Sequence, residues 1–133
     1  MDSNTFNRDI IDCPFCKAYK QKNIITNSDL SFAIFDKYPV NAGHVLIIPK
    51  RHCGDYFDLT QKEQLDCWKL INIVKEMLKS NYNPDGFNIG VNINECAGQT
   101  INHTHIHLIP RNIGDMTDPR GGIRHCVAGK GYY

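Results

Sequence analysis

The sequence predicts an α+β fold, in which a β-sheet and one long helix share a core. Three observations support this fold class. A capped amphipathic segment begins at Thr60, and short apolar runs rich in β-branched residues lie between clusters of turn residues. From Phe87 to Asn94, apolar and polar residues alternate. Because helices repeat about every 3.6 residues and strands about every 2, these patterns predict one long helix and at least four strands.

The length of 133 residues predicts a single domain covering 1–133. Charged residues make up 22% of the chain and its net charge is +1, whereas nucleic-acid-binding surfaces usually carry a strong basic excess. No apolar run approaches the roughly 20 residues of a membrane span, and the polar segment Met1–Ile11 does not resemble a signal peptide. We therefore expect a cytoplasmic protein that binds neither nucleic acid nor membrane.

Two strands of a hairpin come first in the chain. Leu30–Phe35 is short and apolar, and the turn-like residues Lys37–Pro39 follow it. A second turn, Asn41–Gly43, leads into the β-branched run His44–Ile48, which ends at Pro49. Because turn residues join two strand-like runs, we expect the runs to pair as antiparallel neighbours.

The long helix follows. Thr60 and Glu63 have the spacing of a capping box, in which each residue's side chain bonds the other's backbone N–H. Pro84, within the turn-like segment Asn81–Gly86, predicts where the helix ends. Apolar residues recur every three or four positions and predict one buried face: Leu65, Trp68, Ile71, Val74 and Leu78.

Two further strands complete the expected sheet. In Phe87–Asn94 the odd-numbered residues are apolar and the even-numbered ones are Asn or Gly, which predicts a strand with two distinct faces. After the connection Glu95–Gln99, the run Thr100–Ile109 predicts a last strand that ends at Pro110. Residues 112–133 are rich in glycine and turn residues, and we expect a loop-like C-terminal arm.

Three histidines, His103, His105 and His107, alternate along this last strand. They should share one face, with about 6.8 Å between successive Cα atoms. Three idle imidazoles would be costly, because each buried ring needs partners for two nitrogens. A metal site or a histidine nucleophile for phosphoryl chemistry would explain them. Since neighbouring side chains on one face are roughly parallel, they converge poorly on one metal, and we favour one metal-binding histidine beside histidines with another role.

The pair Cys13 and Cys16 has two interpretations: half of a zinc site, or a thiol redox pair. A redox pair should follow a strand and open a helix. Ile10–Ile11 is too short for a strand and Lys17–Asn23 is a poor helix, so we favour zinc. Without an export signal, the six cysteines also favour free thiols and a metal site over a disulfide framework.

The segment Gln99–Pro110, with its alternating histidines, resembles the signature of the histidine-triad family. The similarity extends to Asn41–His52, and Asp118–Arg124 resembles the tail of a microbial branch of that family. Thr104 stands where the family generally has an apolar residue, although its side chain should face away from the triad. The resemblance implies the histidine-triad fold, an antiparallel sheet of about five strands with one long helix. It also implies a homodimer with the helix or an extra strand at the interface.

The resemblance further implies an enzyme, a nucleotide hydrolase or nucleotidyltransferase. It would cleave at the α-phosphate of a nucleoside phosphoramidate or dinucleoside polyphosphate. His105 is then the nucleophile, forming a nucleotidyl-histidine intermediate, and neutral imidazole suits this role near pH 7. His107 would hydrogen-bond toward the leaving side of the phosphate. Gln99 and Thr100 would donate to phosphate oxygens, which makes Gln99 part of the catalytic set, and Asn92 would also contact phosphate.

Two residues of the first hairpin match the remaining family positions. Asp36 matches, by its spacing from His44, the carboxylate that binds the ribose of a purine nucleotide. His44 is then a supporting ring behind the catalytic strand. The residues alone leave alternatives open, because Asp36 is also a typical turn residue and His44 a possible core histidine.

Related proteins of the microbial, zinc-containing branch hold structural zinc with two cysteines, the histidine after Pro-Lys-Arg and the first triad histidine. The resemblance therefore implies a zinc site with these ligands: Cys13, Cys16, His52 and His103. Residues 1–29 would form an N-terminal zinc-knuckle segment. A closed four-ligand site would attach this segment to the catalytic strand without taking part in chemistry.

Two other functions remain open at this point. The chain could be a nucleotide-binding or interaction module with incidental hydrolysis, or a small thiol-redox protein that uses the two cysteines of the Cys-Pro-Phe-Cys motif. The intact triad favours an enzyme, since a binding module need not keep a nucleophile. Arg120 and Arg124 of the arm would be able to reach phosphates, and the leaving group depends on the shape of the pocket beyond His107.

Overall fold

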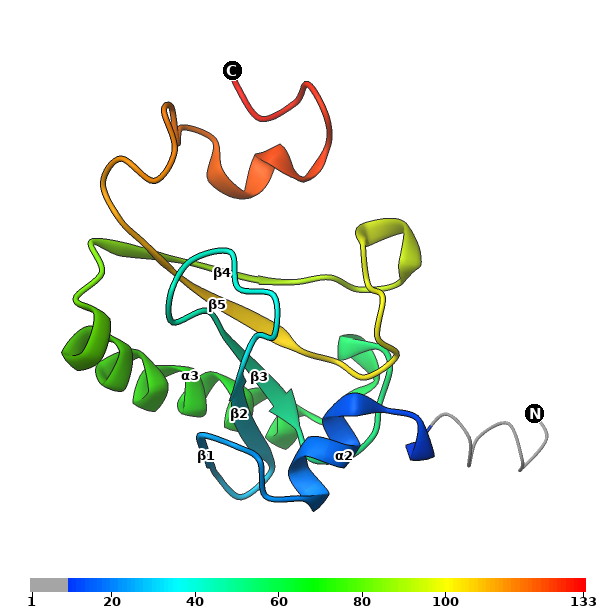
Figure 1. Cartoon of the computed structure of the whole chain (residues 1–133). Coiled ribbons are helices and arrows are strands. Elements are labelled where there is room, and N and C mark those ends of the chain that lie inside the picture. The colour runs from blue at the N-terminus through cyan, green and yellow to red at the C-terminus, as the bar shows by residue number, and fades with distance from the viewer. Residues whose placement is uncertain (1–9) are drawn as a thin grey trace.

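Across residues 10–133, which the computed structural model describes, the chain forms a five-stranded sheet with one long helix (Figure 1). The strand order is β1-β2-β3-β5-β4, and every neighbouring pair is antiparallel. The expected α+β fold is therefore confirmed. The strands are β1 (Thr26–Asn27), β2 (Ser31–Phe35), β3 (Val45–Pro49), β4 (Gly86–Val91) and β5 (Ile106–Arg111).

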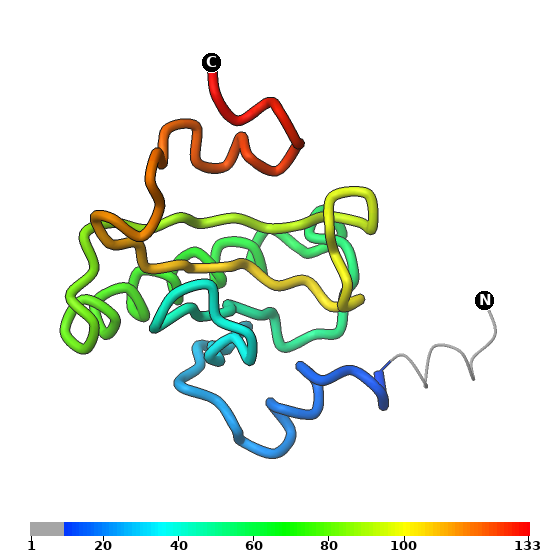
Figure 2. The backbone as a smooth tube through the Cα atoms, turned by 45° about the horizontal axis from the view of Figure 1, so that its top comes forward, coloured from blue at the N-terminus to red at the C-terminus, as the bar shows by residue number. Residues whose placement is uncertain are grey.

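The helices lie on opposite faces of the sheet. α3 (Gln61–Tyr82) packs on one face, and the shorter α2 (Pro14–Lys20) lies on the other (Figure 2). The capping box of α3 is confirmed: the Thr60 hydroxyl accepts from the Glu63 N–H at 3.1 Å, and Glu63 Oε1 accepts from the Thr60 N–H at 2.9 Å. No helix among residues 10–133 has the length and apolarity needed to cross a bilayer.

The buried face of α3 differs in part from the expected one. Leu65 and Trp68, expected to be buried, are 64% and 40% exposed. At about 100° per residue, they lie about 160° and 100° around the helix from Cys67, the centre of the buried face. Ile71, Val74 and Leu78 are buried as expected. The helix also buries Glu63, Cys67 and Leu70, and all six residues lie within about 60° of Cys67 around the helix.

The sheet is buried on both faces at its centre, because every residue of β3 is buried. Ala33, Val45 and Ile47 face the α3 side, while Phe32 and Leu46 face α2. The hairpin of β2 and β3 is confirmed, with Phe35 opposite Val45 and Ser31 opposite Pro49. The face away from α3 is the one that carries the site described below.

The last strand is shifted from the expected Thr100–Ile109. β5 begins at Ile106, because the preceding loop bonds the Cys53 carbonyl through Thr104 instead of continuing a strand ladder. β5 also runs through Pro110 to Arg111. At Pro110 only β4 is paired with β5, because the pairs with β3 extend no further than Leu108. A proline is tolerated there because its missing N–H breaks no ladder on the open side. β4 likewise ends at Val91 and does not reach the expected Asn94.

Candidate functional site

A cavity of about 1380 Å³ lies on the face of the sheet opposite α3. Because β2 and β4 lie toward opposite edges of the sheet, the cavity has two ends. The end at α2 and β2 is apolar, with Phe15, Ile24 and Ile34, and the end at β4 contains Asn88 and Gly90. The other polar lining residues include Asp36, His44, Asn92, Thr100, His105 and His107.

The three histidines of the triad divide between two environments. The rings of His105 and His107 lie 5.2 Å apart and both line the cavity. His103 is fully buried and joins a cluster with the two cysteines. Phe15 of α2 packs edge-on against both His103 and His105, at 5.9 and 4.9 Å between ring centroids. Of the three, only His103 lies beside the cysteines, whereas His105 and His107 line the cavity, which is the division that the sequence favoured.

The hydrogen bonds of His105 fix its tautomer. Its Nδ1 lies 2.8 Å from the carbonyl oxygen of His103, which can only accept, so Nδ1 carries the proton. Nε2 of the neutral ring then carries the lone pair. Burial lowers the pKa of His105, against the raising effect of this hydrogen bond, so the ring is neutral near pH 7. The arrangement leaves one nucleophilic nitrogen on a residue that lines the cavity.

A second chain of hydrogen bonds fixes the tautomer of His107. The Val40 N–H donates to Nδ1 of His44 at 3.0 Å, so the proton of His44 is on Nε2, which donates to Nδ1 of His107 at 2.9 Å. Nε2 of His107 consequently carries a proton and is a donor. Burial, together with neighbouring His105 and His44, lowers the pKa of His107 to about 4. His107 is therefore a neutral hydrogen-bond donor near pH 7.

Asp36 completes this group from the end of β2. Its Oδ2 lies 3.4 Å from His44 Nε2 and 3.9 Å from His107 Nδ1, and the three side chains offer ligand atoms within 4.8 Å of one another. A metal would need a lone pair on His44 Nε2, yet the Val40 N–H already uses the lone pair of Nδ1. The group is therefore a hydrogen-bonded chain, and its tautomers disfavour metal binding.

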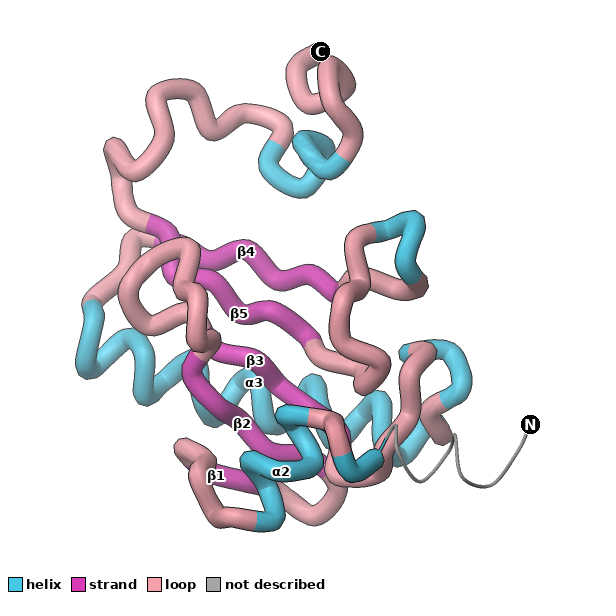
Figure 3. The backbone as a smooth tube through the Cα atoms, turned by 45° about the vertical axis from the view of Figure 1, so that its right-hand side comes forward, coloured by secondary structure: helices cyan, strands magenta, loops and turns pink. Residues whose placement is uncertain are grey.

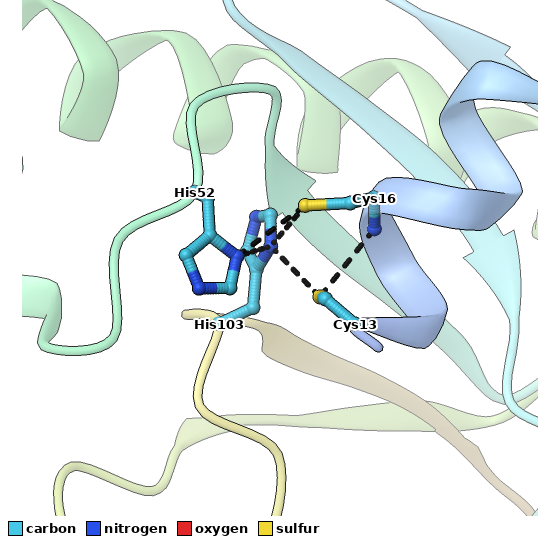
Figure 4. Close-up of side chains that lie close together, drawn as sticks. All are labelled: Cys13, Cys16, His52 and His103. Carbon is cyan, nitrogen blue, oxygen red and sulfur yellow. Dashed lines mark hydrogen bonds between the residues drawn. The ribbon is translucent and has the colours of Figure 1, made fainter. Parts of the chain in front are cut away.

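A separate cluster contains two cysteines and two histidines (Figure 4). Nδ1 of His103 lies 3.4 Å from Cys13 Sγ, 3.5 Å from Cys16 Sγ and 3.2 Å from Nδ1 of His52. Ligands around tetrahedral zinc are about 3.3 to 3.8 Å apart, given its usual bond lengths. His103 Nε2 also donates to the Pro49 carbonyl at 2.7 Å, which leaves Nδ1 available to a metal. The donor set and its spacing fit zinc.

A short helix contains Cys16, where the sequence did not predict one. Residues after Cys16 form a helix after all: α2 spans Pro14–Lys20, with Pro14 in its first turn and Phe15 buried. A proline is favourable there, because the first helical N–H groups have no intrahelical partner. No strand precedes the cysteines within the described residues, since Ile10 and Ile11 are helical. The part of segment 1–29 before residue 10 lies outside the described residues.

The expected phosphate-binding residues occupy different positions. Asn92 and Thr100 line the cavity, whereas Gln99 is not among its lining residues. The Gln99 amide accepts from the Asn94 N–H at 2.8 Å and donates to the carbonyls of Gly54 at 2.7 Å and Ile101 at 3.0 Å. In this arrangement Gln99 supports the loop before β5. A direct contact between Gln99 and phosphate would require its amide to leave these partners and stays a prediction.

Several lining residues were not anticipated from the sequence. Phe15 and Ala18 come from α2, whose helical spacing would have revealed them had this short helix been expected. The sequence indicated only that Asn88 is a polar residue of a predicted strand. In the structure it lines the cavity, and its side-chain oxygen accepts a hydrogen bond from the Arg111 guanidinium at 2.6 Å. Ile123 of the arm also lines the cavity, and no periodicity in that glycine-rich segment pointed to it.

The fold and the site together define a class of protein. In this chain, His105 just before β5 and His107 within β5 line a cavity on one face of an antiparallel sheet, and His103 lies beside two cysteines on the same face. A family model described as the HIT domain matches residues 17–114. The chain therefore belongs to the HIT, or histidine-triad, family.

Individual relatives agree with this membership. A bis(5′-adenosyl)-triphosphatase of Dictyostelium discoideum is 38% identical, over 73% of this chain and 65% of that protein. The crystal structure of a HIT family protein from Bacillus anthracis has a TM-score of 0.73 at 34% identity, covering 78% of this chain and 76% of that one. A zinc-bound histidine triad family protein from Mycobacterium smegmatis has a TM-score of 0.74 at 27% identity, covering 82% and 81%. The chain spans less than two thirds of the curated relatives' length.

Proposed function

We propose that this chain hydrolyses dinucleoside polyphosphates by attack of His105 on an α-phosphorus, through a nucleotidyl-histidine intermediate. The observation that carries this proposal is the tautomer of His105, whose Nδ1–H is bound to the His103 carbonyl so that Nε2 keeps its lone pair. The substrate class is supported by relatives named as dinucleoside tri- and tetraphosphatases. Bond formation at Nε2 needs no prior deprotonation, because burial keeps the ring neutral near pH 7.

The first step transfers the nucleotidyl group. Nε2 of His105 attacks the α-phosphorus and forms a P–N bond, while the bond from that phosphorus to the bridging oxygen breaks and its electrons leave with the polyphosphate. The Nε2–H of His107 donates a hydrogen bond to an oxygen on which charge develops. Asn92 and Thr100, which also line the cavity, would donate to the remaining phosphate oxygens.

The second step releases the nucleotide. The adduct is an imidazolium, because Nδ1 keeps the proton that it donates to the His103 carbonyl. Water attacks the phosphorus, the P–N bond breaks, and the ring departs as a neutral imidazole. The proton from water goes to solvent. The products are a nucleoside monophosphate, the remaining nucleotide and the original form of His105.

The state of His107 favours a polyphosphate leaving group over an amine. A polyphosphate leaves as an oxyanion, which requires a hydrogen bond but no proton, whereas the amine of a phosphoramidate must be protonated as it leaves. With a pKa lowered to about 4, mainly by burial, His107 donates a hydrogen bond but is a poor acid near pH 7. We therefore favour dinucleoside polyphosphates among the candidate substrates.

The nucleoside would occupy the end of the cavity at α2 and β2. Its purine base suits the apolar wall that includes Phe15, Ile24 and Ile34. The Asp36 carboxylate, which lies beside His44 at the start of the polar region, suits the two ribose hydroxyls. Its Oδ1 already accepts from the Tyr38 N–H at 2.8 Å, which orients the carboxylate.

We propose a structural zinc ion held by the cluster of Cys13, Cys16, His52 and His103. The ligand spacing and the Pro49 carbonyl on His103 support it, as does the zinc-bound relative from M. smegmatis. Zinc would supply a rigid link between α2 and the loop before β5, and no chemistry. Because His103 is one of the ligands, zinc would fix the backbone two residues before His105.

A homodimer is also part of this proposal. β4 lies at an edge of the sheet and pairs only with β5 among the described strands, and an unpaired edge is available to a second chain. The apolar side chains Leu65 and Trp68 on the outer surface of α3 are exposed. Sedimentation at micromolar concentration checks this, and a purely monomeric chain would contradict it.

The test of the enzymatic proposal compares the native chain with His105→Ala. We expect the native chain to convert diadenosine tetraphosphate to AMP and ATP, and the variant to lose at least about 10³-fold in kcat while still binding the substrate. Chromatography follows the products and calorimetry the binding. Mass spectrometry of rapidly quenched native protein should detect one added adenylate.

Two outcomes would contradict the proposal. Binding without AMP release by the native chain would indicate a nucleotide-binding module. Cleavage that survives His105→Ala would remove His105 as the nucleophile. The thiol-redox alternative is tested separately, by zinc content and thiol titration, because it requires Cys13 and Cys16 to cycle through a disulfide without metal.

A further inference from the structure

The C-terminal arm, residues 112–133, is folded on itself. The His125 Nε2–H donates to the Arg120 carbonyl at 2.8 Å, and the Tyr132 hydroxyl donates to the Asp118 carbonyl at 2.9 Å. Gly121 has a φ of +90°, and a Cβ there would overlap the carbonyl oxygen of Gly131. These contacts give the arm a defined shape, so it presents particular side chains to its surroundings.

The arginines of the arm are engaged within it. Arg120 pairs with Asp118 at 2.8 Å, and Arg124 donates to the Lys130 carbonyl at 3.0 Å while its guanidinium lies over the Tyr133 ring. In this structure neither arginine is among the residues that line the cavity. The residue that the arm contributes to the cavity is instead apolar, Ile123.

Ile123 lies over the edge of the sheet beside His107. It belongs to the short turn η3 (Gly122–Cys126), which contacts β4, and Figure 3 shows the arm turning back above β4. Its Cδ1 is 3.7 Å from where a Cβ of Gly90 would be, and Gly90 is paired with His107 across β4 and β5. Ile123, which is 59% exposed, therefore borders the cavity at the end away from α2.

We propose that Ile123, with Asn88 and Ile109, forms the subsite for the leaving half of the substrate, and that this half ends in a second nucleoside. This inference rests on the proposed function, which places the adenylate at the α2 end and the reacting phosphorus at His105. The leaving half then extends over β5 and β4, toward the arm. The matched family model ends at residue 114, so Ile123 lies beyond it.

The size and chemistry of this end favour a nucleoside. Pockets that bind one drug-sized ligand have volumes of roughly 300–1000 Å³. The cavity here, of about 1380 Å³, is larger and leaves room for two nucleosides. Ile123 and Ile109 offer an apolar surface to a flat base, and the Asn88 amide offers donors to its edge. A leaving group as small as ammonia or sulfate would leave this surface without a partner.

The test uses two substrates that share the adenylate half. Diadenosine tetraphosphate has a second nucleoside, whereas adenosine 5′-phosphoramidate leaves ammonia. We expect Ile123→Ala to raise KM for diadenosine tetraphosphate about three- to ten-fold, with kcat/KM for the phosphoramidate changed by less than about two-fold. Ile113→Ala is the matched control, because it removes the same atoms from an arm residue that is 91% exposed. It should leave KM and kcat/KM unchanged for both substrates.

The outcomes separate this inference from the proposed function. Equal loss with both substrates, or no change with either, overturns the leaving-group subsite. If the native chain cleaves neither substrate, the proposed function fails, and the subsite is decided by calorimetry. Ile123→Ala should then weaken binding of diadenosine tetraphosphate about three- to ten-fold while leaving AMP binding unchanged, and equal effects on both ligands overturn it.

Discussion

At the scale of single residues, Thr104 shows how a departure from a family pattern is accommodated. It is 1% exposed, where a hydroxyl without a partner would be costly. Its N–H and its hydroxyl both donate to the Cys53 carbonyl, at 2.7 and 2.9 Å. Because Cys53 follows His52 and Thr104 lies between His103 and His105, these bonds join the two loops that carry the cluster and the nucleophile. Thr104 is therefore a positioning residue in the structure.

Replacing Thr104 with valine tests this contribution. Valine keeps the shape but removes the hydroxyl donor, so we expect the free energy of unfolding to fall by about 1 kcal/mol, the typical value of one hydrogen bond. Urea denaturation measures the change. Thr117→Val, at an exposed position of the arm, should change stability by less than about 0.5 kcal/mol. Equal effects of the two substitutions would show that the Thr104 hydroxyl has no special role.

At the scale of elements, the N-terminus of α3 is attached to the loop after β3 by one carboxylate. Glu63 caps the helix through the Thr60 N–H and also accepts from Arg51, at 2.9 Å from Nε and 2.8 Å from Nη2. The Arg51 hydrogen bond, then the bonds with Thr60, lower the pKa of Glu63 from 4.5 to about 2, against the opposing effect of burial. The ionised carboxylate therefore links α3 to the segment that contains His52.

This link predicts a pH dependence of stability. The pKa of Glu63 is lower in the folded chain, so its contribution is fully present above pH 4.5 and is lost as the pH falls toward 2. The groups near the Glu63 carboxylate that carry charge are Arg51 and, if ionised, the thiols of Cys53 and Cys67. We expect Glu63→Gln to lower the free energy of unfolding by about 1–3 kcal/mol at pH 7. The loss is no larger because Arg51 is half exposed, so solvent weakens its attraction to the Glu63 carboxylate.

Denaturation of the native chain and the variant at pH 7, 4.5 and 3 provides the measurement. The stability difference should shrink as the pH decreases. Glu76→Gln is the control, since the Glu76 carboxylate is 69% exposed and pairs only with the neighbouring Lys75 among the salt bridges of the described chain. A difference that stays constant down to pH 3 would contradict the role of the Glu63 charge.

At the scale of the whole molecule, the cysteine and histidine cluster connects segments that are distant in the sequence. Cys13 and Cys16 lie at the start of α2, while His52 follows β3 and His103 precedes β5. A metal at this point would replace several weak contacts by one link between α2 and the sheet. α2 in turn provides Phe15, which contacts His105. The cluster should therefore affect both stability and activity.

Removal of zinc tests this link. We expect about one zinc per native chain by elemental analysis and a melting temperature that falls by about 10 °C or more after chelation. Cys16→Ser should lose most of the zinc, and Cys96→Ser, an exposed cysteine outside the cluster, should keep it. A metal-free native chain with an unchanged melting temperature after chelation would contradict the zinc proposal.

The sequence determined the parts of this protein that depend on local patterns. The capping box at Thr60, the hairpin of β2 and β3 and the existence of the strand β4 follow from spacing of a few residues and formed as expected, although β4 is shorter than predicted and Ile89 on its predicted apolar face is exposed. The motif around the histidines was also sufficient to identify the family, because the alternation of three histidines after Gln99 is rarely seen otherwise. Local geometry carries this information, since turns, caps and strand periodicity involve neighbours in the chain.

Only the tertiary structure decided where those patterns meet. The hydrogen bonds that set the tautomers of His105 and His107 come from a backbone carbonyl and from His44, and no spacing along the chain predicts them. The shift of β5, the helix at Pro14 and the position of Ile123 over Gly90 likewise depend on contacts between distant segments. These features share one physical reason. A buried polar group or apolar side chain takes the partner that packing brings to it, and packing is a property of the whole fold.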